Sequence, residues 1–252
     1  MDKHFLEILF NVQSGLKRQG PGDDDSTREV LQACNLPVKA DILDIGCGPG
    51  AQTMVVAGQL PDASIMAVDF HAPYLMQLEE RAQAAGYADR ITTYRGDMNE
   101  LPFSPESFDL IIAEGSAYIM GFVNALKSWK PLLRNNGYIA VTELVWLTIT
   151  PPEEAATFFN EEYPAMTTPE NIIMAVQEAG YKPLKHFTVP DKGWWVEYYT
   201  PLADRLDLLE KKYADDETGR TVIQMTRQEI DIRKRFGESY GYEFFIAQNI
   251  KE

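Results

Sequence analysis

Residues 41–50 read DILDIGCGPG, an apolar run that contains an acid, followed by three glycines at alternate positions. The run at 41–45 is short and apolar, which is typical of a strand buried on both faces of a parallel sheet. Glycine at Gly46, Gly48 and Gly50 lets the backbone turn sharply and lets a ligand approach the main chain. Because ligands of open α/β sheets bind outside the carboxyl ends of the strands, this stretch predicts a site for a nucleotide-like ligand.

The sequence around this stretch alternates strand-like and helix-like segments. The predicted strands of this region are 41–45, 63–69, 91–95, 108–113 and 137–145. The predicted helices lie at 51–60, 73–85 and 121–133, after an N-terminal helix over 3–18. Strand, helix and strand at this spacing form βαβ units, so we expect an α/β fold with a doubly wound, mostly parallel sheet.

The chain beyond residue 150 follows a different, mostly helical pattern. Its predicted helices are 152–162, 168–179, 199–214 and 220–236, and its predicted strands are 183–189 and 242–248. We expect the long helical insertion before the last strand to form a lid over a site. The alternative is that it merely packs on the sheet.

The composition argues against several classes of protein. The chain has 252 residues, of which 45% are apolar and 24% charged, which suits one sizeable core. Its formal net charge of −15 disfavours nucleic acid and anionic membranes as partners. Two cysteines, Cys34 and Cys47, are too few for a disulfide framework and indicate a reducing compartment. Since neither a secretory signal nor an apolar run of about 18 residues occurs, we expect a cytoplasmic protein.

Two kinds of ligand fit the glycine-rich stretch. Gly46, Gly48 and Ala51 satisfy the G-x-G-x-x-G/A dinucleotide fingerprint, and Asp69 follows at a fitting distance. Asp44, however, stands two residues before the first glycine, where a carboxylate would repel a pyrophosphate but accept a hydrogen bond from an ammonium group. No basic residue follows the stretch closely to pair with phosphate. The acid therefore favours a cofactor that carries an ammonium group over a dinucleotide.

The segment resembles the first motif of class I S-adenosylmethionine-dependent methyltransferases, an acid followed by G-x-G-x-G. Residues 41–145 follow that family in order, since Asp69 ends the second strand, Asp97 and Met98 follow the third, and FDLII at 108–112 looks like the fourth-strand motif. The resemblance implies S-adenosylmethionine as the cofactor, with Asp69 on the ribose hydroxyls and Asp97 on the adenine amine. It also implies a Rossmann-like sheet whose last strand is antiparallel. The residues implied to bind the cofactor are Asp44, Gly46, Cys47, Gly48, Gly50, Asp69, Phe70, Asp97, Met98, Glu114, Gln19 and Gly20.

The ends of the chain are similar to a narrower group, bacterial small-molecule methyltransferases of unsettled substrate. The similar stretches are RQGPG at 18–22, AEGSAY at 113–118 and YEFFIA at 242–247. We expect residues 18–22 to fold over the cofactor, the alternative being a plain turn between helices. The expected organisation is one domain over 1–252, made of an N-terminal lid segment (1–40), a cofactor-binding core (41–145) and helical additions over the acceptor site (146–180 and 198–240).

Aromatic and acidic residues gather where the acceptor would bind, after the predicted strands. Tyr118 is the candidate catalytic residue, because related enzymes often carry a histidine near that place, and it could orient the acceptor or receive its proton. The alternative is a tyrosine packed under the lid. These residues suit either a neutral aromatic or thiol acceptor, or an amine held as a cation by rings and carboxylates. The candidate acceptor-binding residues are Glu143, Trp146, Trp194, Trp195 and Tyr198.

The leading hypothesis is an enzyme that transfers a methyl group to a small-molecule acceptor. The cofactor carries the activation, so the protein must align the reacting atoms and exclude water. A non-catalytic S-adenosylmethionine-binding or sensing protein is the alternative, and an NAD-dependent dehydrogenase is a more distant one. No metal site is expected, since the three histidines are scattered and paired-cysteine motifs do not occur. The apolar N-terminal helix could form a homodimer contact or cover the sheet.

Overall fold

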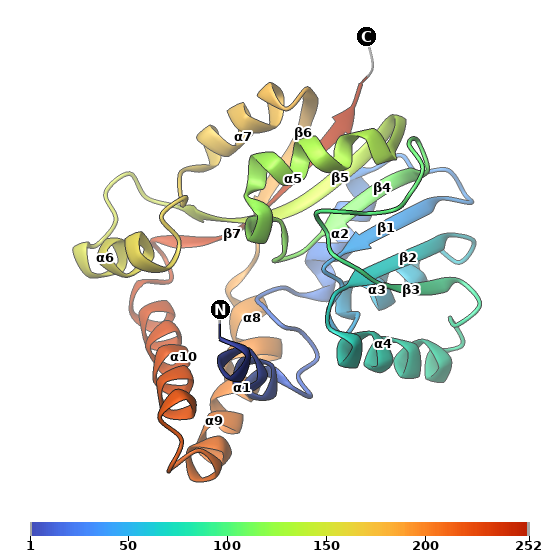
Figure 1. Cartoon of the computed structure of the whole chain (residues 1–252). Coiled ribbons are helices and arrows are strands. Elements are labelled where there is room, and N and C mark those ends of the chain that lie inside the picture. Colours follow the sequence, from blue (N-terminus) through green and yellow to red (C-terminus); the bar gives the residue numbers. More distant parts are fainter. Residues whose placement is uncertain (1, 251–252) are drawn as a thin grey trace.

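A computed structural model describes residues 2–250 and places one sheet at the centre of the molecule (Figure 1). Its strands are β1 (Asp41–Ile45), β2 (Ser64–Asp69), β3 (Ile91–Arg95), β4 (Phe108–Ala113), β5 (Leu133–Trp146), β6 (Tyr181–Thr188) and β7 (Tyr240–Asn249). They lie in the order β3-β2-β1-β4-β5-β7-β6, in which β1 to β5 pair in parallel and β7 is antiparallel to both neighbours. The strand order therefore reverses between β1 and β4, which makes the carboxyl ends of these two strands the switch point where ligands bind.

Helices cover both faces of the sheet. One face carries α2 (Asp24–Ala33), α3 (Ala51–Gln59) and α4 (Ala72–Ala85), and the other carries α5 (Phe122–Trp129) and α7 (Pro169–Glu178). Ile42 and its neighbour Leu43 are both fully buried, yet they belong to the cores on opposite faces. Since successive strand residues point to opposite faces, this two-sided cover explains why β1 is apolar throughout except for its acids.

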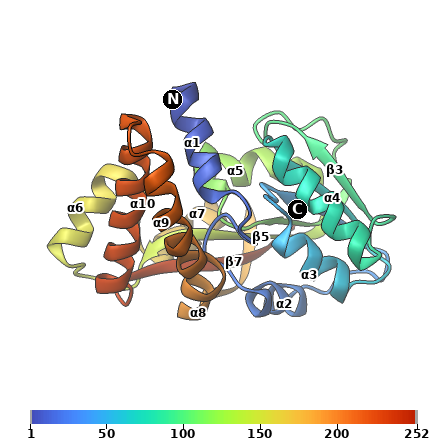
Figure 2. The same cartoon turned by 90° about the horizontal axis from the view of Figure 1, so that it is seen from below.

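A separate helical layer stands beyond the carboxyl end of β5 (Figure 2). It consists of α1 (Lys3–Gln13), α6 (Glu153–Glu162), α8 (Asp191–Trp194), the π-helical turn η3 (Trp195–Tyr199), α9 (Thr200–Lys212) and α10 (Glu217–Phe236). These elements share a third apolar core, in which Ile8 and Val12 of α1 lie in one cluster with Leu206 of α9 and Val222 of α10. Segments from both ends of the chain thus form one layer.

The α/β fold class predicted from the sequence is confirmed, with a few different element ends. The N-terminal helix, predicted over 3–18, ends at Gln13, because Gly15 takes a left-handed φ of +80°. Residues 14–22 instead form a loop, called here the N-terminal loop. The helix predicted over 121–133 ends at Trp129 and is followed by the 3-10 turn η2 (Lys130–Leu132), which contains a proline that cannot continue an α-helix.

One strand is longer than predicted, and two short elements are additional. The strand predicted to begin at 137 begins at Leu133. The short α8 and the π-helical η3, which precede the predicted helix at 199–214, were not expected from the sequence. The hydrogen bonds of a π-helical turn join residues five positions apart, and single π turns often occur at functional sites. Another 3-10 turn, η1 (Ala117–Met120), follows β4.

Candidate cofactor and acceptor site

The glycine turn connects β1 to α3 and meets the carboxyl end of β4. Gly46 and Gly50 have φ of +74° and +85°, which favour glycine. A Cβ at Gly46 would lie 2.4 Å from Ser116 Cβ, and one at Gly50 would lie 2.2 Å from Leu78 Cδ1. Ser116 Oγ also donates to the carbonyl oxygen of Ile45 at 2.6 Å, which ties the end of β4 to β1. Conformation and space both require glycine at these two positions.

Asp44 lies beneath this turn and is fully buried. Its carboxylate accepts hydrogen bonds from Thr53 Oγ1 at 2.5 Å and from Gln52 Nε2 at 3.1 Å, both on α3. Burial, together with the nearby carboxylates of Glu114 and Asp69, raises the pKa of Asp44 to about 7. The sequence suggested that Asp44 would accept a hydrogen bond from a cofactor. Asp44 has no exposed surface through which a ligand could reach its oxygens, so its part in the site is to hold the start of α3 beside the turn.

Asp69 ends β2 beside the same turn. Its Oδ2 accepts a hydrogen bond from the backbone N–H of Gly48 at 2.9 Å, and its Oδ1 accepts one from the N–H of His71 at 2.8 Å. Burial raises the pKa of Asp69, although these backbone bonds oppose the effect. Each carboxylate oxygen still has a lone pair to offer a ligand. Cys47, which lies in the turn, is buried, and burial raises the pKa of its thiol, so its backbone is the part suited to a ligand.

An aromatic group from two distant segments lies over the end of β2. Phe10 of α1 stacks on His71 with 3.9 Å between ring centroids and contacts Phe70 at 5.6 Å. Tyr74 packs edge-on against His71, and its hydroxyl donates to Gln19 Oε1 at 2.6 Å. The structure thus brings α1 and the N-terminal loop onto the edge where a cofactor ribose would bind. Phe70 and Gln19 were predicted to bind the cofactor, whereas no pattern in the sequence pointed to Phe10 or Tyr74.

Asp97 and Met98 follow β3 at this same edge. Asp97 is exposed, and hydrogen bonds from the backbone and side chain of Asn99 lower its pKa, so it is a charged acceptor facing solvent. The carbonyl oxygen of Met98 accepts from Trp129 Nε1 at 3.1 Å. Met98 Cε lies 3.8 Å from the place of a Cβ on Gly46, so Met98 borders the glycine turn directly.

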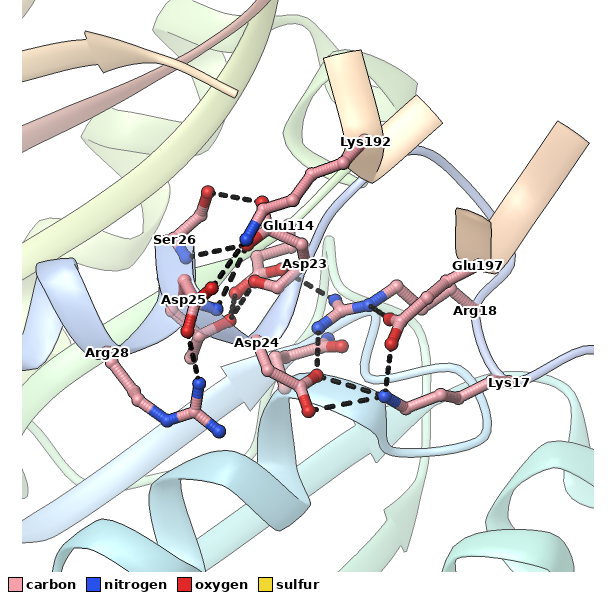
Figure 3. Close-up of polar contacts among 12 residues, drawn as sticks. Lys17, Arg18, Asp23, Asp24, Asp25, Ser26, Arg28, Glu114, Lys192 and Glu197 are labelled. Atoms are coloured by element: carbon pink, nitrogen blue, oxygen red, sulfur yellow. Dashed lines mark hydrogen bonds and ion pairs between the residues drawn. The ribbon is translucent and has the colours of Figure 1, made fainter. Parts of the chain in front are cut away.

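Arg18 anchors the N-terminal loop from the inside (Figure 3). The residue is 4% exposed, and its guanidinium donates to Glu114 at 3.0 Å, to Asp24 at 3.0 Å and to Glu197 at 2.9 Å. Thr27 Oγ1 donates to the other oxygen of Glu114 at 2.7 Å. Burial raises the pKa of Glu114, and Arg18 opposes this rise. Glu114, which the family resemblance assigned to the cofactor, is thus bound to protein groups, and the ion pairs join the loop to α2, β4 and η3.

A cavity of about 460 Å³ lies between the N-terminal loop, the segment after β4 and the helical layer. Gln19 and Gly20 line it from the loop, and Gly115 and Tyr118 line it from the segment after β4. Gln19 Cγ also lies 3.4 Å from the place of a Cβ on Gly48, so the cavity and the glycine turn share a wall. The other walls are largely aromatic and include Phe158, Phe159, Tyr163, Trp194, Tyr198 and Tyr199.

The candidate acceptor-binding residues are not all at this cavity. Trp194 and Tyr198 line it. Trp146 lies behind the wall, edge-on to Phe159 with 5.6 Å between ring centroids. Trp195 points elsewhere, since its Nε1 donates to Asp191 Oδ1 at 3.2 Å. Of these two adjacent tryptophans, Trp194 lines the cavity and Trp195 does not.

Glu143 does not line the cavity itself but is hydrogen-bonded to a residue that does. It lies next to the cavity-lining Leu144 on β5, so its side chain points to the opposite face of the sheet. One carboxylate oxygen accepts a hydrogen bond from the hydroxyl of Tyr163, which lines the cavity. Burial raises the pKa of Glu143 to about 7.

Sequence reasoning missed Glu229, a carboxylate in the cavity wall. It lies on α10 and accepts a hydrogen bond from the Tyr199 hydroxyl at 2.7 Å. Burial raises its pKa. The surrounding sequence is rich in charged residues, which is typical of a solvated helix face, so no local pattern distinguishes this glutamate from its neighbours.

Residues 2–250 contain neither a candidate metal site nor a membrane-spanning helix. No group of three or more His, Cys, Asp or Glu side chains in this range is arranged to hold a metal ion. None of the helices described is both long enough and apolar enough to span a membrane.

Comparison with known proteins decides the family. Residues 42–137 match a protein family that is described as "Methyltransferase domain". Residues 42–137 thus carry a methyltransferase domain, and the proteins similar to the chain are class I S-adenosylmethionine-dependent methyltransferases. The family and its cofactor, as the sequence resemblance implied, are confirmed, and the dinucleotide fingerprint at Gly46 and Gly48 gains no support.

Three similar proteins show how far the likeness extends. The demethylmenaquinone methyltransferase of Lactiplantibacillus plantarum is 31% identical over 85 residues, which are 33% of this chain and 36% of that protein. The O-methyltransferase resE of Aspergillus sclerotiorum is 21% identical over 99% of this chain and 96% of its own length. A methyltransferase from Geobacter sulfurreducens, solved with S-adenosyl-L-homocysteine, has a TM-score of 0.82 at 20% identity and covers 96% of this chain and 97% of its own. The chain thus spans about a third of the first relative and nearly all of the other two.

Proposed function

We propose that this methyltransferase-domain protein transfers the methyl group of S-adenosylmethionine to a small-molecule acceptor by in-line displacement. The observation that carries the proposal is the wall shared by the glycine turn and the aromatic cavity. Gln19 lies against the turn at Gly48 and also lines the cavity. A donor at the turn and an acceptor in the cavity would therefore meet beside Gln19.

The residues that would hold the cofactor lie at the carboxyl ends of β1 to β4. Asp69 offers lone pairs to the ribose hydroxyls, and the exposed Asp97 offers a carboxylate to the adenine amine. Arg18 pairs with Glu114, and the pKa of Asp44 is raised to about 7, so Asp69 is the acid beside the turn that suits a ligand with a sulfonium and an ammonium group. These groups fit S-adenosylmethionine.

The protein's own part in the reaction would be alignment and the exclusion of water. When bound, the cofactor supplies an activated methyl group on a sulfonium centre. Arg18 would hold the N-terminal loop over it through the three ion pairs to carboxylates. Tyr118, in the cavity wall next to the turn after β4, is proposed to orient the acceptor. Holding the reacting atoms in line is a large part of such catalysis, so a strong base is not required.

The acceptor is proposed to be a small molecule. A volume of about 460 Å³ is within the range of small-ligand pockets. The residues that we infer to contact the acceptor directly are Trp194 and Tyr198, with Glu143 acting through Tyr163. Helices from both ends of the chain wall the cavity, which supports the division into a core and helical additions that cover the acceptor site. The net charge of −15 disfavours a nucleic acid acceptor.

The location and the assembly state are further parts of the proposal. A cytoplasmic location is supported by Cys34 and Cys47, both buried and free. A homodimer through the apolar face of α1 has weaker support, because Ile8 and Val12 already pack inside the helical layer. Light scattering on the purified chain would test the homodimer, and a monomer mass would reject it.

The test is calorimetric titration with S-adenosylmethionine and, separately, with NAD. We expect binding of S-adenosylmethionine alone. Asp69→Asn should weaken this binding about tenfold or more, since one hydrogen bond to a charged group is lost. Asp62→Asn, which changes an exposed acid at the other end of β2, is the matched control and should leave the affinity unchanged. Binding of NAD alone would overturn the proposal, and S-adenosylmethionine binding with no methyl transfer to any amine, thiol or phenol would favour the sensing alternative.

A further inference from the structure

The acceptor cavity combines many tyrosines with carboxylate groups. Tyr118, Tyr163, Tyr198, Tyr199, Tyr240 and Tyr242 all line it. Glu162 and Glu229 line it as well, and Glu143 lies behind Tyr163. A neutral aromatic acceptor would need rings but no carboxylates. The carboxylates in the wall therefore restrict the class of ligand more than the aromatic rings do.

Glu229 is the best-placed charge in this wall. Its carboxylate accepts the Tyr199 hydroxyl at 2.7 Å, which fixes the side chain on the cavity side of α10. Burial raises its pKa, and the nearby Glu162 raises it further. A carboxylate in such surroundings lacks the solvation that it would have in water, and a positive charge beside it would restore part of the lost stabilisation.

Basic side chains do not compensate these acids at the cavity. Among the described residues that line it, none is lysine, arginine or histidine. Arg233 does not line the cavity but lies behind Trp194, 3.9 Å from the centroid of that ring. Its guanidinium donates to the carbonyl oxygen of Tyr240 at 2.8 Å and to Asp191 at 3.0 Å, so an acid outside the cavity already pairs with its charge. The ionisable side chains that line the cavity are therefore acids and tyrosines.

Glu143 adds to this charge from behind the wall. It is 2% exposed, and its Oε2 has no hydrogen-bond partner among the residues described. Its other oxygen is bound by Tyr163. In a low-dielectric interior a carboxylate acts over a longer distance than in water. A cation near Tyr163 would be attracted by Glu143 without touching it.

We propose that the methyl acceptor is an organic cation, an apolar body carrying an ammonium group that binds at Glu229 among the tyrosine rings. An ammonium group can donate to the carboxylate and lie against ring faces at the same time. The apolar body would fill the part of the cavity walled by Phe158, Phe159 and Trp194. This inference rests on the proposed function and specifies its substrate class.

The experiment uses matched probes on the full chain saturated with S-adenosylhomocysteine. The amines are benzylamine, 2-phenylethylamine and 3-phenylpropylamine, each compared with the alcohol of the same length. Calorimetric titration should show tighter binding of at least one amine than of its alcohol, by about 10-fold or more, as expected for a hydrogen bond to a charged group. Equal or tighter binding of the alcohols, or no binding of any amine, would overturn the inference.

Variants identify the group that recognises the charge. Glu229→Gln keeps an oxygen for the Tyr199 hydroxyl but removes the negative charge, so it should abolish the preference for the amine. Its affinity for S-adenosylhomocysteine should not change, which also shows that the variant is folded. Glu238→Gln, an exposed glutamate just after α10, is the matched control and should keep the preference. An unchanged preference in Glu229→Gln would overturn the inference.

The two proposals fail differently in this experiment. If S-adenosylhomocysteine does not bind to the wild-type chain, the proposed function fails, and the inference that rests on it fails as well. If S-adenosylhomocysteine binds but amines are not preferred, only the substrate class is wrong.

Discussion

Asp44 and Glu143 are both buried carboxylates whose pKa values burial raises to about 7, but their surroundings differ. Asp44, under the glycine turn, has both oxygens bound by Gln52 and Thr53, which follow it closely in the sequence. Glu143, behind the acceptor cavity, has one oxygen bound by Tyr163 and the other without a hydrogen-bond partner among the described residues. Each oxygen of Asp44 thus has a hydrogen-bond partner in the protein, whereas one oxygen of Glu143 has none among the described residues.

This difference extends to the two halves of the site. The base of the cofactor half is built from strand ends and one turn, where Asp44 binds Gln52 and Thr53 and Asp69 binds Gly48. The N-terminal loop then joins it from a distant part of the sequence, through Arg18 and Gln19.

The acceptor half is built from segments far apart in sequence, as in the bond between Tyr199 and Glu229. Its carboxylates lack positively charged partners in the wall. The acceptor half therefore depends on its ligand to pair its carboxylates. This is expected when the cofactor is common to a class of enzymes and the acceptor is particular to one protein.

The largest effect is expected at Arg18, which joins the two halves. Arg18→Met leaves the buried Glu114 with only Thr27 as a partner, so it should lower the free energy of unfolding by about 3–5 kcal/mol. Urea unfolding followed by circular dichroism measures this change. Adding Glu114→Gln to Arg18→Met removes the unpaired charge and should recover a large part of the loss. Equal stability of the single and double variants would show that the pair does not join the halves.

A smaller effect is expected within the cofactor half, at Gly46. Gly46→Ala combines a left-handed φ with a Cβ only 2.4 Å from Ser116 Cβ, so it should lower the free energy of unfolding by about 2–4 kcal/mol. Gly86 has a similar φ of +75° but open space around the Cβ position. Gly86→Ala should therefore cost only about 1 kcal/mol and leave the cofactor affinity unchanged. A similar cost for both variants would mean that the contact with Ser116 does not restrict the turn.

The same contrast explains how much could be predicted from the sequence. The cofactor half was predictable because its determinants are local: a short apolar strand, glycines at fixed spacing and acids at strand ends. The alternation of strands and helices over 41–145 likewise gave the sheet and its direction. Even there, the partners of Asp44 and Glu114 were not predicted, because they depend on side-chain packing.

The acceptor half was predicted only in outline. Aromatic residues near 194–198 were expected at the site, but the sequence could not distinguish Trp194 from Trp195. Trp194 ends α8 and Trp195 begins the π-helical turn η3, and neither short element has a simple pattern in the sequence. Glu229 was missed because it lies 30 residues from its partner Tyr199 and in a stretch that is typical of an exposed helix face.

The smallest effect, and the sharpest test of the comparison, concerns the pH dependence of stability. Asp44 and Glu143 have pKa values of about 7 in the folded chain, against about 4 when unfolded. Between these values the folded chain holds protons that the unfolded chain has released. Each carboxyl therefore makes the free energy of unfolding fall as the pH rises from about 4 to about 7, and its contribution is constant above that range.

Asp44→Asn and Glu143→Gln each remove one of these protons, so each variant should lose less stability than the wild type between pH 5 and pH 7, by on the order of 1–2 kcal/mol. Urea unfolding at several pH values measures this difference. Cofactor affinity then separates the two positions. Asp44→Asn should weaken S-adenosylhomocysteine binding, because Asp44 accepts from Gln52, which also donates to the carbonyl oxygen of Cys47 in the turn. Glu143→Gln should leave the affinity unchanged, because Glu143 lies behind Tyr163. A wild-type pH dependence in both variants, or an equal loss of cofactor affinity in both, would contradict the division of the site into two halves.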